Sequence, residues 1–211
     1  MPTFTYFDLH GRAAPCRMLL AHKGVEYEDR RLTQEAYGEL KAQGVLDGLP
    51  VWEFDHMGST KMLNESKALL RYLGKEYGYY PSDPKRAWVC DAYLDYMTPL
   101  MEKFSANFLN QDLGDEFKLK LKEEMLLLAE KIVKTMEDKR KFLCGSSITI
   151  ADFMVFGILA NWHRNDANPA KEAIEEVFEE IHGKHEVFKL WIEACWLENQ
   201  KHLEEREARP F

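Results

Sequence analysis

Cysteine is scarce in this 211-residue chain, which has four: Cys16, Cys90, Cys144 and Cys195. They lie far apart along the sequence and form no C-x-x-C pair, so neither a zinc cage nor a redox dithiol is indicated. We expect free thiols that are mostly buried, and we predict no metal site.

Long apolar runs and a surplus of positive charge are also missing. No stretch approaches the roughly 20 apolar residues that are needed to span a membrane, and the start, Met1-Pro2-Thr3, lacks the basic and apolar segments of a secretory signal. The formal net charge is −8, whereas contact with nucleic-acid phosphates needs Lys and Arg in surplus. We therefore expect a soluble, cytoplasmic protein with no membrane or nucleic-acid partner.

The chain has enough residues, 45% of them hydrophobic, to bury a substantial core. Apolar periodicity predicts alternating strands and helices up to about Tyr77, and the segment 78–84 then breaks every pattern. We predict an α+β fold in three parts: a strand-and-helix domain over residues 1–78, a linker over residues 79–85 and an all-α helical bundle over residues 86–211.

The predicted bundle contains several amphipathic helices. They span about Arg86 to Asn110, Asp115 to Lys139, Lys171 to Ile181 and His185 to Leu203. Between the second and third of these, Thr149 and Asp152 have the spacing of a capping box, with Thr149 as the N-cap. This pattern predicts the start of a central helix.

Two short motifs in the first domain indicate a ligand site. Leu49-Pro50 precedes a short strand pattern, where proline does least harm to a ladder. Such a proline is often cis, and a cis bond would turn the Leu49 N–H and C=O outward, where an extended peptide could pair with them. Further on, Glu65-Ser66 opens a predicted helix, whose unpaired amides favour a ligand carboxylate. An ordinary strand entrance and an ordinary N-cap are the alternatives.

The N-terminal residues extend this pattern. Tyr6 lies near the end of a predicted strand, and Gly11-Arg12-Ala13 then leads into a helix. In order and spacing, these residues with Leu49-Pro50 and Glu65-Ser66 resemble the thioredoxin-like domain of cytosolic glutathione transferases of the tyrosine type. With Tyr37 and Lys41, the chain is most similar to the sigma class, which includes glutathione-dependent prostaglandin D synthases. The resemblance implies a thioredoxin-like βαβαββα domain followed by an all-α domain.

The resemblance also implies that Tyr6 donates a hydrogen bond to the glutathione sulfur, with Arg12 as a nearby cation. A thiol with a pKa of about 8.5 is mostly protonated at neutral pH, and only the thiolate is a useful nucleophile. Lowering that pKa by about two units requires roughly 2.7 kcal/mol, which is the order of one charge-assisted hydrogen bond plus a nearby cation. A half-buried strand tyrosine is the alternative role for Tyr6.

A binding site for glutathione and a homodimer follow from the same resemblance. The implied contacts are Tyr37 and Lys41 at the glycyl end, Leu49 and Pro50 at the backbone, Glu65 and Ser66 at the γ-glutamyl end, and Asp95 at the γ-glutamyl amine in the partner subunit. An acid that reaches the partner implies a homodimer with shared sites. Tyr37 and Lys41 could instead be surface residues of a loop. The family commonly has Lys or Gln before Leu49, whereas this chain has Gly48, which removes one expected contact.

A second, hydrophobic substrate is expected to contact an apolar wall between the two domains. The candidates are Phe7, Leu9, Met97, Met101, Met154 and Ile158. Methionines suit a permissive pocket because they are flexible and polarizable, but at helical spacing they are also typical of a core. His10 could donate to a ligand, although a solvated turn histidine is the simpler interpretation.

Three functions remain open at this point. The first is an enzyme that conjugates glutathione to hydrophobic electrophiles, or isomerises a lipid peroxide as prostaglandin D synthases do. The second is a non-catalytic binding or structural protein on the same scaffold, like the lens crystallins derived from this class. The third is a thiol transferase that uses Cys16, but Cys16 follows Pro15 inside the helix, where a buried cysteine is favoured.

Overall fold

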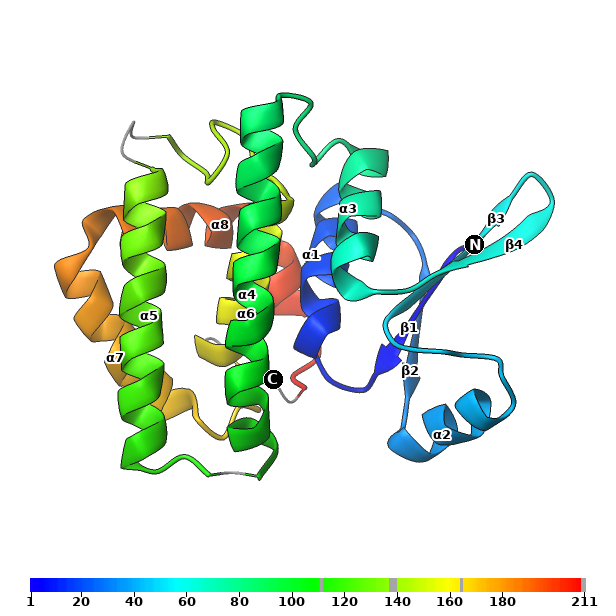
Figure 1. Ribbon diagram of the computed structural model, residues 1–211, viewed down its shortest axis with the longest axis horizontal. Helices are drawn as coiled ribbons and strands as arrows, with labels where there is room; N and C mark the ends of the chain where they lie inside the picture. Colours follow the sequence, from blue (N-terminus) through cyan, green and yellow to red (C-terminus); the bar gives the residue numbers. More distant parts are fainter. Residues whose placement is uncertain (111, 137–139, 164, 210–211) are drawn as a thin grey trace.

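The computed structural model describes residues 1–110, 112–136, 140–163 and 165–209, and it has two parts (Figure 1). The first part contains β1 (Thr3–Phe7), η1 (Gly11–Ala13), α1 (Ala14–Lys23), β2 (Glu28–Leu32), α2 (Gln34–Ala42), β3 (Val51–His56), β4 (Ser59–Leu63) and α3 (Ser66–Tyr77). The second contains α4 (Pro84–Asn110), α5 (Asp115–Thr135), α6 (Ile150–His163), α7 (Lys171–Lys184) and α8 (Glu186–Glu205). The predicted α+β fold, with its βαβαββα order, is confirmed.

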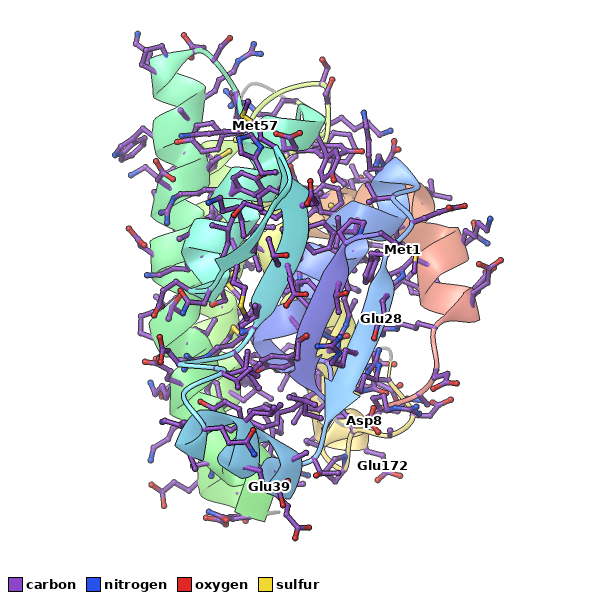
Figure 2. All side chains as sticks on the ribbon, turned by 90° about the vertical axis from the view of Figure 1, so that its right-hand side faces the viewer. Met1, Asp8, Glu28, Glu39, Met57 and Glu172 are labelled. Carbon is purple, nitrogen blue, oxygen red and sulfur yellow. The ribbon has the colours of Figure 1, made fainter. Side chains whose placement is uncertain are left out.

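The four strands form one sheet in the order β2-β1-β3-β4. Strand β1 pairs in parallel with β2 and antiparallel with β3, and β3 pairs antiparallel with β4. Helices α1 and α3 lie between this sheet and the helical part (Figure 1). Figure 2 views the molecule from the sheet side, with Glu28 on the edge strand β2 and Met57 at the turn between β3 and β4.

Glycine and proline set the ends of several helices. Gly24 ends α1 and Gly78 ends α3, each with a positive φ (72° and 85°) that closes the last turn. Helix α4 begins at Pro84, earlier than the predicted start at Arg86, because proline is well suited to the first position of a helix. Helix α5 ends at Thr135, and the predicted end at Lys139 lies outside the described residues.

Helix α6 is the centre of the helical part. Every residue from Ile150 to Trp162 is buried. The predicted start of this helix is confirmed: the Asp152 carboxylate accepts hydrogen bonds from the Thr149 N–H and hydroxyl, each at 2.9 Å. It also accepts from the Leu143 N–H and from Trp191 Nε1, both at 2.9 Å. Asp152 therefore joins α6 to α8 and to the turn before α6.

The two parts contact each other through α1 and α6. A Cβ atom placed on Gly157 of α6 would lie 3.3 Å from the Cα atom of Pro15 in α1. A larger residue at this position would require the backbone at Pro15 to shift by a few tenths of an ångström. In the part of the chain that is described, no helix is long and apolar enough to cross a membrane.

Candidate functional site

Tyr6 lies on β1 and is 7% exposed. The Arg12 N–H donates to the Tyr6 hydroxyl oxygen over 3.3 Å. Burial raises the pKa of Tyr6, although this hydrogen bond and the charges of Arg12 and Arg17 oppose the shift. The Tyr6 side chain is therefore a neutral phenol at pH 7, with a proton to donate to an anion.

Gly11 makes the approach of the chain to Tyr6 possible. Its φ is +41°, and an added Cβ atom would lie 3.0 Å from the Tyr6 hydroxyl oxygen and 2.6 Å from Leu9 Cδ1. A side chain at this position would displace the hydroxyl group that the site presents.

Arg12 forms an ion pair with Glu102 of α4, with 2.8 Å between Nη2 and Oε1. Both side chains are about half exposed (49% and 54%). Such exposed pairs contribute little stability, so the Arg12 guanidinium remains available to an anionic ligand. Glu102 is not among the predicted site residues, because a contact between residues so far apart in sequence leaves no local pattern.

A cavity of about 220 Å³ opens beside Tyr6 and Arg12. Its lining combines residues of both parts: Tyr6, Phe7, Leu9, Gly11, Arg12, Gln34, Met101, Glu102, Ser105, Phe108 and Trp162. Among the predicted pocket residues, Phe7, Leu9 and Met101 line it. Phe108 was missed, although it follows Met101 by two helical turns and therefore shares its face of α4.

The other predicted pocket residues lie elsewhere. Met154 is 6% exposed and lines a second, narrow cavity together with Arg12, Ser66 and Met101. Met97 and Ile158 are 0% and 1% exposed and belong to the core. Their assignment to the pocket is corrected: they lie on the buried faces of α4 and α6, which are apolar for packing reasons.

The start of α3 offers backbone donors near Arg12. Glu65 precedes the helix with φ 66° and ψ 98°, and its side chain makes no capping hydrogen bond. The first-turn amides of a helix favour an anion. The Leu49-Pro50 bond is cis.

Tyr37 and Lys41 lie on helix α2 rather than in an irregular loop. The Tyr37 ring meets the Phe7 ring edge-to-face at 5.3 Å. Lys41 Nζ lies 5.8 Å from the centre of the Tyr37 ring. A row of side chains therefore leads from Phe7, at the 220 Å³ cavity, to the cation at Lys41.

Asp95 is on the outer side of α4, and its side chain is 64% exposed. It pairs with two cations of α3, at 2.9 Å from Lys67 Nζ and 3.7 Å from Arg71 Nη2. The hydrogen bond from Lys67 lowers the pKa of Asp95. The carboxylate is charged at neutral pH and accessible to a ligand or a second subunit.

His10 is buried, with 4% of its surface exposed, so the expectation of a solvated histidine is wrong. Burial lowers the pKa of His10 to about 3, and the nearby cation Arg206 adds to the shift. Its Nε2 atom has no hydrogen-bond partner in the described part of the chain. His10 is therefore neutral, and it packs between the start of η1 and the C-terminal segment around Arg206.

The four cysteines are free and buried, as predicted. Burial raises the pKa of Cys16 to about 12, which gives no support to a reactive thiol there. Cys90 and Cys144 are far apart in sequence, but their sulfur atoms are only 3.4 Å apart. This contact could not be read from the spacing of the cysteines in the sequence. Within the described ranges, no cluster of His, Cys, Asp or Glu could hold a metal ion.

Comparisons with known proteins agree with this geometry. The model of the glutathione S-transferase N-terminal domain matches residues 2–75, and that of the C-terminal domain matches residues 95–189. Hematopoietic prostaglandin D synthase of Gallus gallus is 33% identical over 156 residues, which cover 72% of this chain and 76% of that protein. S-crystallin 4 of Enteroctopus dofleini is 28% identical over 185 residues, which cover 80% and 85%.

A crystal structure of the glutathione S-transferase from Ascaris lumbricoides superposes with a TM-score of 0.76 at 25% identity, over 98% of both chains. The chain belongs to the glutathione S-transferase family. The presence of S-crystallins and a prostaglandin D synthase among its relatives confirms the predicted likeness to the sigma class.

Proposed function

We propose that the chain is an active glutathione transferase that conjugates glutathione to small hydrophobic electrophiles, a detoxification reaction. The observation that carries this proposal is the neutral Tyr6 hydroxyl group, which lines the same apolar cavity as Phe7, Leu9 and Met101. A proton donor at an apolar cavity can stabilise a thiolate and keep it next to a hydrophobic substrate.

In this proposal glutathione lies extended between α2 and α3. Its glycyl carboxylate is directed to Tyr37 and Lys41, its backbone pairs with Leu49 beside Pro50, and its γ-glutamyl end meets Glu65 and Ser66. The Tyr6 hydroxyl donates to the thiolate, and the Arg12 cation adds to its stabilisation. The thiolate then attacks the electrophilic carbon of the second substrate in the 220 Å³ cavity.

The protein is further proposed to be a cytoplasmic homodimer, in which Asp95 of each subunit completes the glutathione site of the other. The charged and exposed Asp95 carboxylate supports this role. If each chain contributes to both sites, the protein has its full affinity for glutathione only as a dimer.

The test is turnover of chlorodinitrobenzene with glutathione by the parent and by Tyr6→Phe. If the hydroxyl lowers the thiol pKa from about 8.5 to about 6.5, its loss reduces the thiolate fraction at pH 7 about 25-fold. We expect a fall in kcat of that order, with the glutathione Kd little changed because the hydroxyl acts mainly on the thiolate. Tyr27→Phe, at a tyrosine that packs between Phe4 and Trp52, is the matched control.

A Tyr6→Phe variant with kcat within twofold of the parent would refute the role of Tyr6. A parent protein that binds glutathione but converts neither electrophiles nor lipid peroxides would instead favour the crystallin-like alternative, which the name of S-crystallin 4 supports. Isomerisation of a prostaglandin endoperoxide would identify the synthase alternative, which the name of the Gallus gallus relative supports.

A further inference from the structure

Cys90 of α4 and Cys144, in the turn before α6, form a pair of thiols outside the glutathione site. Their sulfur atoms are 3.4 Å apart, and either one can donate the hydrogen bond between them. A second contact holds the pair together, because Cys144 Sγ lies 3.6 Å from the Arg86 carbonyl oxygen of α4. In Figure 1 the segment between α5 and α6 runs past the first turns of α4.

Only one member of the pair lines a surface cavity. Cys144 is 2% exposed and lines a surface cavity of about 620 Å³, together with Arg86, Trp88 and Arg140. Cys90 lies behind it and is 0% exposed. A small oxidant in the cavity can therefore reach the sulfur of Cys144, with Cys90 directly behind it.

The surroundings of Cys90 suit a sulfur that carries negative charge. The hydrogen bond from Cys144 and those from Thr149 and the Ala151 N–H lower the pKa of Cys90. Thr149 and Ala151 lie at the start of α6, where unpaired amides favour an anion. The contact with Cys90 and burial raise the pKa of Cys144, so Cys144 keeps its proton until it transfers that proton to the adjacent Cys90 sulfur.

We propose that Cys90 and Cys144 are a modification site, at which a small hydroperoxide forms a reversible disulfide bond within the chain. Cys90 first releases its proton to solvent; the Cys144 thiol then transfers its own proton to the Cys90 sulfur and attacks the peroxide oxygen, the O–O bond breaks, and an alcohol (water, for hydrogen peroxide) leaves with a proton from solvent. The Cys90 sulfur then attacks the sulfenic acid, so that the S–S bond forms and the S–O bond breaks. The hydroxide leaves as water with the proton that the Cys90 sulfur had received. Two electrons pass from the sulfurs to the peroxide.

The other two cysteines provide an internal comparison. Cys16 and Cys195 are both 0% exposed, and burial raises the pKa of each thiol. Neither lines the cavity that reaches Cys144. The proposal therefore predicts that oxidation of the folded chain removes two of its four thiols.

The experiment treats the folded, full-length protein with hydrogen peroxide, stops the reaction with an alkylating reagent and counts the thiols after unfolding. We expect the loss of two thiols, their recovery with dithiothreitol, and a Cys90–Cys144 cross-link in the peptide map. Cys195→Ala is the matched control and should still form the bond. Cys144→Ser should lose thiols at least ~10-fold more slowly, because the member of the pair that lines the cavity is gone.

The peptide map of the parent decides the proposal even if a variant fails to fold. A cross-link between other cysteines, a bond between two chains, or four intact thiols after peroxide treatment would overturn it. So would a Cys90–Cys144 bond that forms only in urea, since the proposal requires the folded arrangement.

Discussion

Because His10 is buried as a neutral imidazole, we predict that the folded protein loses stability in weak acid. Its pKa is lowered to about 3 in the folded chain, from an ordinary value of 6.5. The groups that face it are cations and another histidine: Arg206, Arg17, Arg31 and His202. Burial lowers the pKa of His202 to about 4 as well. Both imidazoles stay neutral in the folded state, whereas the unfolded chain takes up protons below pH 6.5.

The sign and size of the effect follow from this difference. Stability is fully present above pH 6.5 and is lost as the pH falls toward the folded pKa values, because the unfolded state binds more protons. At pH 5, each histidine costs up to about 2 kcal/mol relative to pH 7, or about 4 kcal/mol for the two. His10→Leu should therefore reduce the loss between pH 7 and pH 5 by about 2 kcal/mol.

Urea unfolding at both pH values, followed by tryptophan fluorescence, measures this quantity. The protein concentration is held fixed because dimer formation would add to the apparent stability. His56→Gln is the control, at an exposed histidine on β3. All other titrating groups are common to parent and variant and cancel in the comparison. A His10→Leu protein that loses as much stability as the parent would refute the reasoning.

Three further predictions follow from single residues. Gly48→Lys should tighten glutathione binding by about 0.5 to 1.5 kcal/mol, and by less at high salt, because the added cation attracts the anionic ligand. The new side chain has room, since no heavy atom lies within 4 Å of an added Cβ atom. Calorimetry at two ionic strengths tests it, and unchanged binding would show that the glycyl end is misplaced. Asp95→Ala should weaken glutathione binding in calorimetry, and sedimentation should show a dimer; an active monomer would contradict the shared site. Asp152→Ala should lower the free energy of unfolding by about 3 kcal/mol, because the Leu143, Thr149 and Trp191 donors lose their acceptor; a loss below about 1 kcal/mol in urea unfolding would mean that water replaces the carboxylate.

Local patterns in the sequence predict the order of the elements well. Alternation and helical spacing depend on neighbouring residues, so the βαβαββα order and the start of α6 could be predicted from the sequence. The capping pair of Thr149 and Asp152 is of this kind, because its partners are three residues apart.

Contacts between distant segments could not be predicted in the same way. Glu102 meets Arg12 across the two parts, and Cys144 meets Cys90 over a separation of 54 residues. The burial of His10 depends on the C-terminal segment that brings Arg206 beside it. Each of these depends on how helices pack, for which the sequence has no short-range pattern.

The contact between Gly157 and Pro15 joins the two parts of the molecule at the backbone itself. A movement of helix α1 against helix α6 at this point would reduce their close packing. Tyr6 and Trp162, which both line the cavity, belong to the two parts that this contact joins. In the proposed function, substrates of different shape would be accommodated by rotation of side chains such as Met101. The range of substrates that fit the cavity would then depend on the rotation of its side chains and not on movement of the helices.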